Sequence, residues 1–145
     1  MSHDTHHHHK ESFITKYIFS QDHKMIARQY LITAIFMGAI GIALSALFRL
    51  KLGWPDDKFP ILESILGSDA APDGLLDSNW YLGLVTLHGT IMVFFVLTGG
   101  LSGTFSNLLI PLQVGARDMA SGLLNMISYW LFFLSSVLMA CLLYT

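Results

Sequence analysis

The sequence predicts an all-α, polytopic membrane protein, and three observations indicate this fold class. Of the 145 residues, 53% are hydrophobic and only 12% are charged, which is about half the charged fraction of a typical soluble domain. The mean hydropathy is +0.55. The few charged residues leave three long apolar stretches. Each stretch is long enough to cross about 30 Å of hydrocarbon as a helix with a rise of about 1.5 Å per residue.

The first apolar stretch predicts a membrane-spanning helix at about 29–49. It contains 20 uncharged residues between Arg28 and Arg49, about the number that one span needs. The 28 residues before it are polar, and the stretch is too long for the apolar core of a cleavable signal peptide. The span is therefore expected to act as its own targeting signal.

The second apolar stretch predicts a span and the turn that follows it, and the third stretch predicts a further span. Between Asp77 and Arg117 lie 39 uncharged residues, too many for a single span, so the chain must turn inside this stretch. Pro111 and Gly115 predict the position of the turn. We therefore expect a second span at about 80–108 and a third at about 121–145, where the chain looks truncated.

Basic residues near the span ends predict the orientation. The tail of residues 1–28 carries Lys10, Lys16, Lys24 and Arg28, whereas residues 49–79 hold three basic and six acidic side chains. The bias places the tail in the cytoplasm. The connection at about 50–79 is then an outer loop, in which we expect a short helix at 61–66.

Charge and cysteine content exclude other classes. The formal charge is -2, so the chain has no basic surface for nucleic acid. Its one cysteine, Cys141, predicts neither a disulfide framework nor a cysteine-based metal site. The histidine run at 6–9 is either a tag remnant or a solvated arm that binds metal weakly. We expect a disordered arm without a catalytic role, because a flexible run does not fix coordination geometry.

Small residues on the spans favour close contact between helices. Ala34, Gly38 and Gly41 on the first span, and Gly99 and Gly103 on the second, have suitable spacing for this. We interpret them as helix packing positions only.

His88 is the single histidine inside a predicted span. It follows Trp80 by eight residues, or about 12 Å of helix. Ionisable residues at such depth are candidates for function, and a neutral imidazole is a common ligand of haem iron. A hydrogen bond to a neighbouring helix is an equally good explanation from position alone. Arg49 shares this membrane level; it would either raise the potential of a nearby metal centre or snorkel into water.

A carboxylate and two amides gather at the inner surface. Asn107 lies 19 residues after His88, about 28 Å along a helix, and Asp118 and Asn125 follow it. This group suits the entrance of a proton or cation path. The alternative is that Asp118 is an ordinary acidic loop residue beside Arg117.

Five segments together resemble a known family. They read, in order, DHKMIARQYL, FRLKLG, HGTIMVFF, NLLIPLQVGARDMA and LLNMISYW. Their order, spacing and placement on the spans resemble the N-terminal quarter of subunit I of haem-copper oxidases, over about residues 22–145. The resemblance is to the aa3-like branch with a full-length D-type proton channel, and it implies three helices of a larger bundle of about twelve.

The resemblance implies roles for the outer residues. His88 takes the place of an axial ligand of the low-spin haem, which we expect to be haem a, and Arg49 takes that of an arginine that interacts with this haem. The high-spin haem and copper B are implied on later spans. The 145-residue segment alone is therefore not expected to be catalytic.

The resemblance also implies roles at the inner surface. Asp118 matches the mouth of the proton channel, Asn107 and Asn125 match amides that line it, and Tyr30 matches a tyrosine nearby.

The chain departs from the family pattern in several places. Gly99 stands where a proline is usual, and Thr104 and Ser106 replace glycines, so the bend of the second span is in question. Arg117 lies against the channel mouth, where it would lower the pKa of Asp118. Lys51 replaces a glutamate that helps to bind an outer cation, so we expect that cation to be absent. The outer loop is also longer than usual.

The resemblance implies a terminal respiratory oxidase that reduces O2 to water and pumps protons. Leu44 and Ile40 stand where quinol-oxidising relatives have an acidic and a basic residue. The expected donor is therefore cytochrome c or a fused or neighbouring cytochrome. The expected partners are subunits of the subunit II and III type and the lipid bilayer, in a bacterial inner membrane. The alternatives are a non-catalytic haem-tethering anchor subunit and a quinol-oxidising or nitric-oxide-reducing relative; Asp118 and Asn125 argue against the last.

Overall fold

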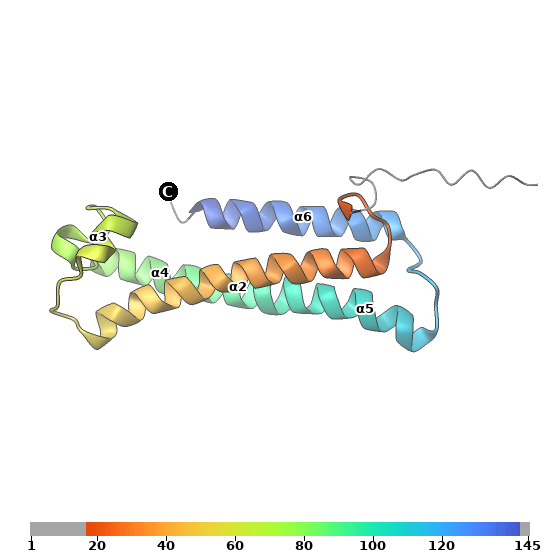
Figure 1. Cartoon of the computed structure of the whole chain (residues 1–145), viewed down its shortest axis with the longest axis horizontal. Coiled ribbons are helices and arrows are strands. Elements are labelled where there is room, and N and C mark those ends of the chain that lie inside the picture. The colour runs from red at the N-terminus through yellow and green to blue at the C-terminus, as the bar shows by residue number, and fades with distance from the viewer. Residues whose placement is uncertain (1–16, 143–145) are drawn as a thin grey trace, which may run out of the picture.

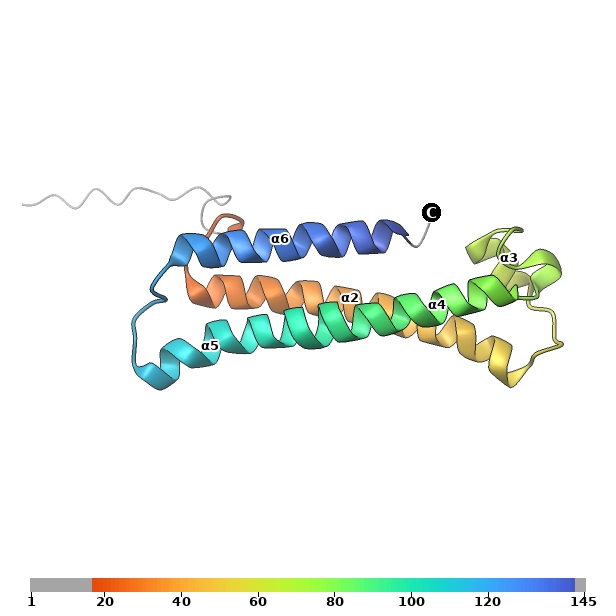
Figure 2. The same cartoon turned by 180° about the vertical axis from the view of Figure 1, so that it is seen from behind.

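Three long helices lie side by side in the computed structural model, which describes residues 17–142 (Figures 1 and 2). Residues 17–142 contain no strand, and each of the three helices is long and apolar enough to cross a membrane. The predicted all-α, polytopic membrane fold is confirmed. The long helices are α2 (His23–Gly53), a rod made of α4 (Ser78–Thr90), η2 (Ile91–Leu101) and α5 (Ser102–Val114), and α6 (Gly122–Cys141). The predicted histidine arm and residues 143–145 of the third span lie outside the described residues.

The first long helix begins earlier than predicted. The Asp22 side chain accepts a hydrogen bond from the backbone N–H of Lys24 at 3.1 Å and so caps α2 at its N-terminus. Residues 23–28, which we assigned to the cytoplasmic tail, therefore belong to the helix. The cap satisfies a backbone N–H at this helix end, and charged residues in the first turns of the helix can remain in water. Charge alone does not mark where this helix starts.

The second span is also longer than predicted. The rod is capped by Asp77, whose side chain accepts from the N–H of Asn79 at 3.0 Å. It continues past Leu108 and through Pro111 to Val114, so most of the connection that we predicted there is helical. The turn comes at Gly115, which has a left-handed φ of 71°. The N–H of Ala116 bonds the Pro111 carbonyl at 3.0 Å, which closes the helix end.

The middle of the rod has wide, π-helical turns over Ile91–Leu101. Such turns are rare and occur frequently at functional sites. They begin three residues after His88. The rod passes Gly99 without a break, so the missing proline leaves a continuous helix with a locally wider backbone.

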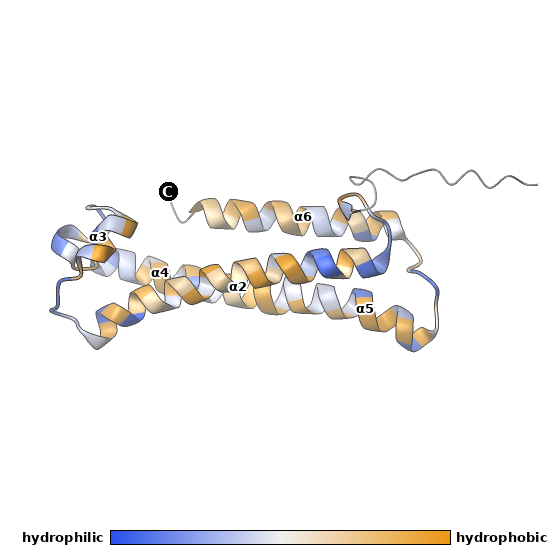
Figure 3. Cartoon of the chain, in the orientation of Figure 1, coloured by the Kyte–Doolittle hydropathy of each residue, from blue (hydrophilic) through white to orange (hydrophobic). Residues whose placement is uncertain are grey.

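Small residues bring the helices together, as the sequence predicts. A Cβ on Gly103 would lie 2.6 Å from the Tyr30 ring, as predicted for a packing position, and a Cβ on Gly100, which the sequence did not single out, would collide with the predicted position Ala34. These contacts join the rod to α2 over apolar surface, which covers most of the length of the long helices (Figure 3). The buried core includes Met37, Leu44, Leu62, Leu84, Ile91 and Phe95.

The outer loop folds over one end of the bundle. Its short helix α3 (Pro60–Leu66) confirms the helix predicted at 61–66, and Leu62 joins the core between α2 and α4. A second short turn, η1 (Pro72–Gly74), returns the chain to α4. The loop is tied to itself by the Phe59 N–H, which donates to the Gly74 carbonyl at 2.9 Å.

Candidate functional site

The outer histidine site, named after the predicted orientation of the chain, consists of His88, Gly41 and Phe48. His88 lies in α4 and is half-buried against α2, with its Nδ1 2.8 Å from the backbone carbonyl oxygen of Gly41. A carbonyl oxygen only accepts, so Nδ1 carries the hydrogen of the neutral ring. Nε2 then keeps its lone pair and is available to a metal.

Gly41 permits this bond because it lacks a side chain. A Cβ at this position would lie 2.8 Å from the sulfur and 3.4 Å from Cγ of Met92, and 3.6 Å from Cγ2 of Ile91. A methyl group would displace only the flexible end of Met92, whereas a bulkier side chain would also press on Ile91 and force α2 and the rod apart at this level. The close approach of the two helices therefore sets the tautomer of His88.

Aromatic contacts hold the imidazole on its other side. The Phe48 ring meets the His88 ring edge-on at 5.5 Å between centroids, and Tyr81 meets Phe48 edge-on at 6.3 Å. Arg49 follows Phe48 in α2 and is exposed, about 100° round the helix. Its predicted contact with a haem stays a prediction.

These residues fit a ligand of haem iron. Histidines that ligate metals usually donate their other ring N–H to a carboxylate, a carbonyl or water, which fixes the ring and raises its basicity. The bond from His88 to Gly41 is of this kind. The site therefore offers one fixed imidazole nitrogen at membrane depth.

The inner polar cluster lies near the other end of the bundle. It consists of Asp22, His23, Tyr30, Asn107, Asp118, Asn125 and Ser128, and it includes an amide pair, Asn107 with Asn125. Asn107 is buried, and its Nδ2 donates to the Gly103 carbonyl at 2.7 Å. The Nδ2 of Asn125 donates across the helices to Oδ1 of Asn107 and also contacts Sδ of Met119 at 3.2 Å. The structure thus joins the two asparagines that the sequence placed at one level.

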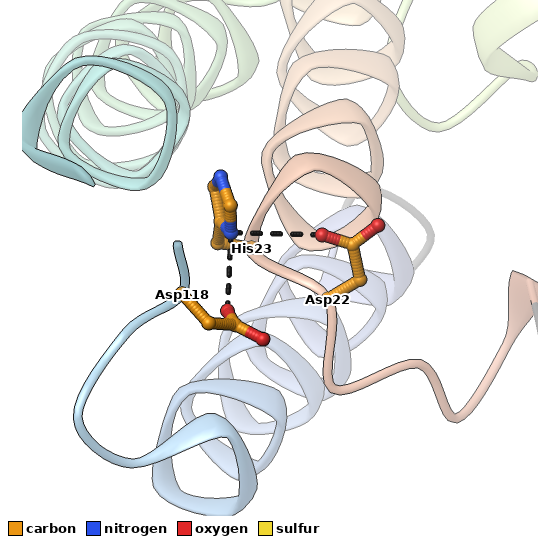
Figure 4. A group of neighbouring side chains, drawn as sticks. All are labelled: Asp22, His23 and Asp118. Carbon is orange, nitrogen blue, oxygen red and sulfur yellow. Dashed lines mark hydrogen bonds and ion pairs between the residues drawn. The ribbon is translucent and has the colours of Figure 1, made fainter. Parts of the chain in front are cut away.

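Asp118 lies in the loop before α6 and bonds elsewhere. Its Oδ1 accepts from the backbone N–H of Met119 at 2.8 Å and from Nδ1 of His23 at 3.1 Å. The same His23 nitrogen lies 3.6 Å from Oδ1 of Asp22 (Figure 4). Ligand atoms of these three side chains lie within 4.8 Å of one another. His23 is buried at the first residue of α2, although the sequence did not single it out.

Hydrogen bonds lower the pKa of the Asp118 carboxyl below its ordinary value. The N–H of Met119 has the largest effect, and the bond from His23 comes next. We predicted a lowered pKa with Arg117 as its cause. The direction is confirmed, but the cause is wrong, because the groups that stabilise the carboxylate are an amide N–H and an imidazole.

Tyr30 joins the cluster through a residue that the sequence did not reveal. Its hydroxyl lies 3.2 Å from Oγ of Ser128, and this serine donates to the Asn125 carbonyl at 2.7 Å. Ser128 therefore links Tyr30 to the backbone of Asn125, whose side chain belongs to the amide pair. Within the described residues, no direct hydrogen bond joins Asp118 to either amide.

Comparison with known proteins gives the family. The family model described as cytochrome c and quinol oxidase polypeptide I matches residues 25–145. The chain belongs to this family. This confirms the resemblance to haem-copper oxidase subunit I, and it makes the chain part of an integral membrane protein.

Relatives of the oxidase polypeptide support the same assignment. The alternative cytochrome c oxidase subunit 1 of Bradyrhizobium diazoefficiens is 42% identical over 132 residues, which cover 91% of this chain and 20% of the relative. The cytochrome c oxidase subunit 1 of Thermostichus vulcanus is 37% identical over 115 residues, or 79% of this chain and 18% of the relative. A probable quinol oxidase subunit 1 of Staphylococcus aureus is 36% identical over 128 residues, or 85% of this chain and 17% of the relative. The chain spans about a fifth of the length of these relatives.

Proposed function

We propose that the chain is the N-terminal part of the catalytic subunit of a terminal respiratory oxidase. The complete subunit would reduce O2 to water with electrons from cytochrome c or a fused or neighbouring cytochrome, and would pump protons. This segment supplies one axial ligand of the low-spin haem and the entrance of the proton channel. The family match and the oxidase names of the relatives support this role.

One observation carries the haem assignment. The Nδ1 of His88 is hydrogen-bonded to the Gly41 carbonyl at 2.8 Å, so Nε2 is the nitrogen that a ring held at membrane depth can offer to a metal. When bound there, a haem supplies one-electron transfer at a potential set by its ligands and by nearby charge. Arg49 would bring a fixed positive charge to the same level, and a cation favours the reduced form. We expect haem a at this position.

The inner polar cluster would take up protons from the cytoplasm. The exposed carboxylate of Asp118 can accept and release a proton at its oxygens. The amides of Asn107 and Asn125 are neutral hydrogen-bonding groups that order water without holding a charge. The Tyr30 hydroxyl continues the cluster along α2. Hydrogen bonds from the Met119 N–H and from His23 lower the pKa of Asp118 and so keep its carboxylate ionised.

The family also supports a proposal for the rest of the complex. The high-spin haem and copper B would be held by other parts of the subunit, beside subunits of the subunit II and III type. The chain would lie in a bacterial inner membrane with its N-terminus in the cytoplasm. Leu44 is fully buried in the apolar core, which supports a cytochrome rather than a quinol as the electron donor at this position.

Replacement of His88 by Ala in the complete subunit tests this function. We expect loss of the low-spin haem absorbance and of oxygen consumption, because no other described side chain at this level offers a fixed nitrogen. His23→Gln is the matched control, since it removes the other described histidine and should leave haem content unchanged. Retention of both haems at wild-type level in His88→Ala would remove His88 as the ligand. A haem-containing complex that consumes no oxygen with any donor would favour the haem-tethering anchor subunit instead.

A further inference from the structure

Two hydroxyl pairs join α2 to α6, and the assignments above use only one of them. The pair nearer the inner surface is Tyr30 with Ser128. The other is Thr33 with Tyr129, whose hydroxyl oxygens lie 3.1 Å apart. Thr33 and Tyr129 are both 7% exposed, so this bond is buried at both ends. Neither residue has a role in the function proposed above.

Few buried residues of α6 hold it against its neighbours, and Tyr129 is one of them. Among the long helices of the described chain, α6 is the least enclosed: 11% of its apolar window is buried, against 28% for α2 and 17% for the rod. Tyr129 and Ser136 are its buried residues. Ser136 donates to the Phe133 carbonyl in its own helix at 2.7 Å, so its hydrogen bond does not connect α6 to another helix. Tyr129 also packs edge-on against Tyr30 at 5.2 Å.

The same rotation of α6 fixes the amide pair. Asn125 precedes Tyr129 by four residues, so the two side chains lie one above the other on one face of the helix. Tyr129 reaches α2, and Asn125 reaches Asn107 in α5. A rotation that breaks the first bond moves the Asn125 amide relative to Asn107. Hydrogen bonds tolerate only a few tenths of an ångström of such movement.

We propose that Tyr129 and Thr33 are positioning residues for proton uptake: their hydroxyl bond holds α6 at the rotation in which Asn125 meets Asn107. Their effect on proton uptake rests on the function proposed above. Their effect on the amide geometry does not. The Phe132 ring, which packs on Tyr30 and on Phe95 of the rod, also holds α6 against its neighbours, and the hydroxyl bond adds a directional constraint to this apolar packing.

The experiment uses the complete oxidase with single substitutions that preserve shape. Tyr129→Phe and Thr33→Val each remove one hydroxyl and leave its partner unpaired. Thr33→Ser keeps the hydroxyl and should rescue. Ser136→Ala is the matched control, because it removes an equally buried hydroxyl of α6 that bonds only within its own helix. The low-spin haem absorbance reports assembly in every variant.

Two signals are measured: the infrared band of the side-chain amide, assigned as the band that an Asn125→Asp variant lacks, and the rate of proton pumping, which reports proton uptake. We expect Tyr129→Phe and Thr33→Val to shift the band and to slow proton uptake about threefold, which is what an average hydrogen bond between membrane helices is worth. The Thr33→Ser and Ser136→Ala variants should match the wild type in both signals.

The outcomes separate this inference from the proposed function. An unshifted amide band in both Tyr129→Phe and Thr33→Val overturns it, as does an equal shift in Ser136→Ala. If Asp118→Asn lowers pumping while the band-shifted variants pump as the wild type does, the inference fails and the proposed function stands. If Asp118→Asn pumps normally and the band still shifts, the positioning stands and the proton route through Asp118 fails.

Discussion

The outer histidine site and the inner polar cluster are built in opposite ways. At the outer site, one side chain is fixed by a backbone carbonyl, that of Gly41, and by an aromatic ring. At the inner cluster, side chains from three helices and a loop bond mostly to one another, and each bond contains a hydrogen that can exchange. A metal ligand needs one fixed lone pair. A proton route needs groups that give and accept hydrogen in turn.

The two regions also differ in exposure. His88 is half-buried in a predicted membrane span, whereas the side chain of Asp118 is 58% exposed. Charges near a low-dielectric interior act more strongly and are screened less than charges in water. A charge change at the outer site should therefore alter redox properties, whereas one at the inner cluster should alter rates of proton uptake.

Of the following substitutions, Asp118→Asn in the complete oxidase should have the strongest effect, and it tests the role of the inner polar cluster. We expect oxygen turnover to fall about tenfold and pumping to be lost while both haems assemble. Proton transfer by a positioned group is worth about 10²–10⁴-fold, and water at this exposed site can replace part of it. Oxygen electrode and proton-pumping measurements check this.

Asp22→Asn is the matched control, because Asp22 is the other carboxylate beside His23. It should retain most of its turnover. Wild-type turnover with full pumping in Asp118→Asn would make the inner carboxylate an ordinary loop residue.

The second prediction concerns Gly41 at the outer histidine site. Gly41→Val should force α2 away from Met92 and Ile91 and so lengthen the bond from His88, at a cost of about 1–3 kcal/mol for an overfilled contact. The low-spin haem should become partly lost or spectrally mixed. Gly38→Ala is the control, because a Cβ there would meet Val96 at an ordinary 3.7 Å. Equal spectra for both variants would show that the Gly41 carbonyl does not set His88.

Much of the fold follows from the sequence, but the helix ends do not. Uncharged stretches locate the three spans because charges are costly in hydrocarbon. They do not locate the start at His23, where the Asp22 cap allows polar first turns, or the end at Val114, where the helix runs through Pro111. The π-helical turns of Ile91–Leu101 also have no sequence signal, because they depend on how neighbouring helices meet.

The third prediction concerns Arg49→Met, which removes a charge at the level of His88. We expect the low-spin haem's absorption band to shift and its potential to fall, since a nearby cation favours the reduced haem. Redox titration with optical detection measures both. An unchanged band and potential would show that Arg49 snorkels into water.

The smallest expected effect is that of His23→Gln on the Asp118 carboxyl. The variant should raise the pKa of Asp118 only part of the way to its ordinary value, because the Met119 N–H, the larger cause, remains. A lowered carboxyl pKa stabilises the fold at pH values above the unfolded pKa, and this contribution is lost as pH falls through the folded pKa. His23→Gln should therefore lose less stability on acidification. Infrared titration of the carboxyl band checks the direction, and an unchanged or lower pKa would contradict it.

The candidate sites divide in the same way as the fold. His88 can be found from the sequence because a histidine in a span is unusual, and the asparagines because helical rise places them at one level. The partners cannot. His23 and Asp118 are 95 positions apart, and Gly41 and His88 are 47 apart. Only the crossing of the helices brings these pairs together.

The central claim is that Nε2 of His88 binds haem iron. The most direct test is an experimental structure of the complete oxidase at a resolution that shows the axial ligands. We predict a distance of about 2 Å between Nε2 of His88 and the low-spin haem iron, which is typical of a metal bond to an imidazole nitrogen. The Nδ1 of the same ring should stay bonded to the Gly41 carbonyl. A His88 ring with neither nitrogen within about 3 Å of a metal would contradict the claim.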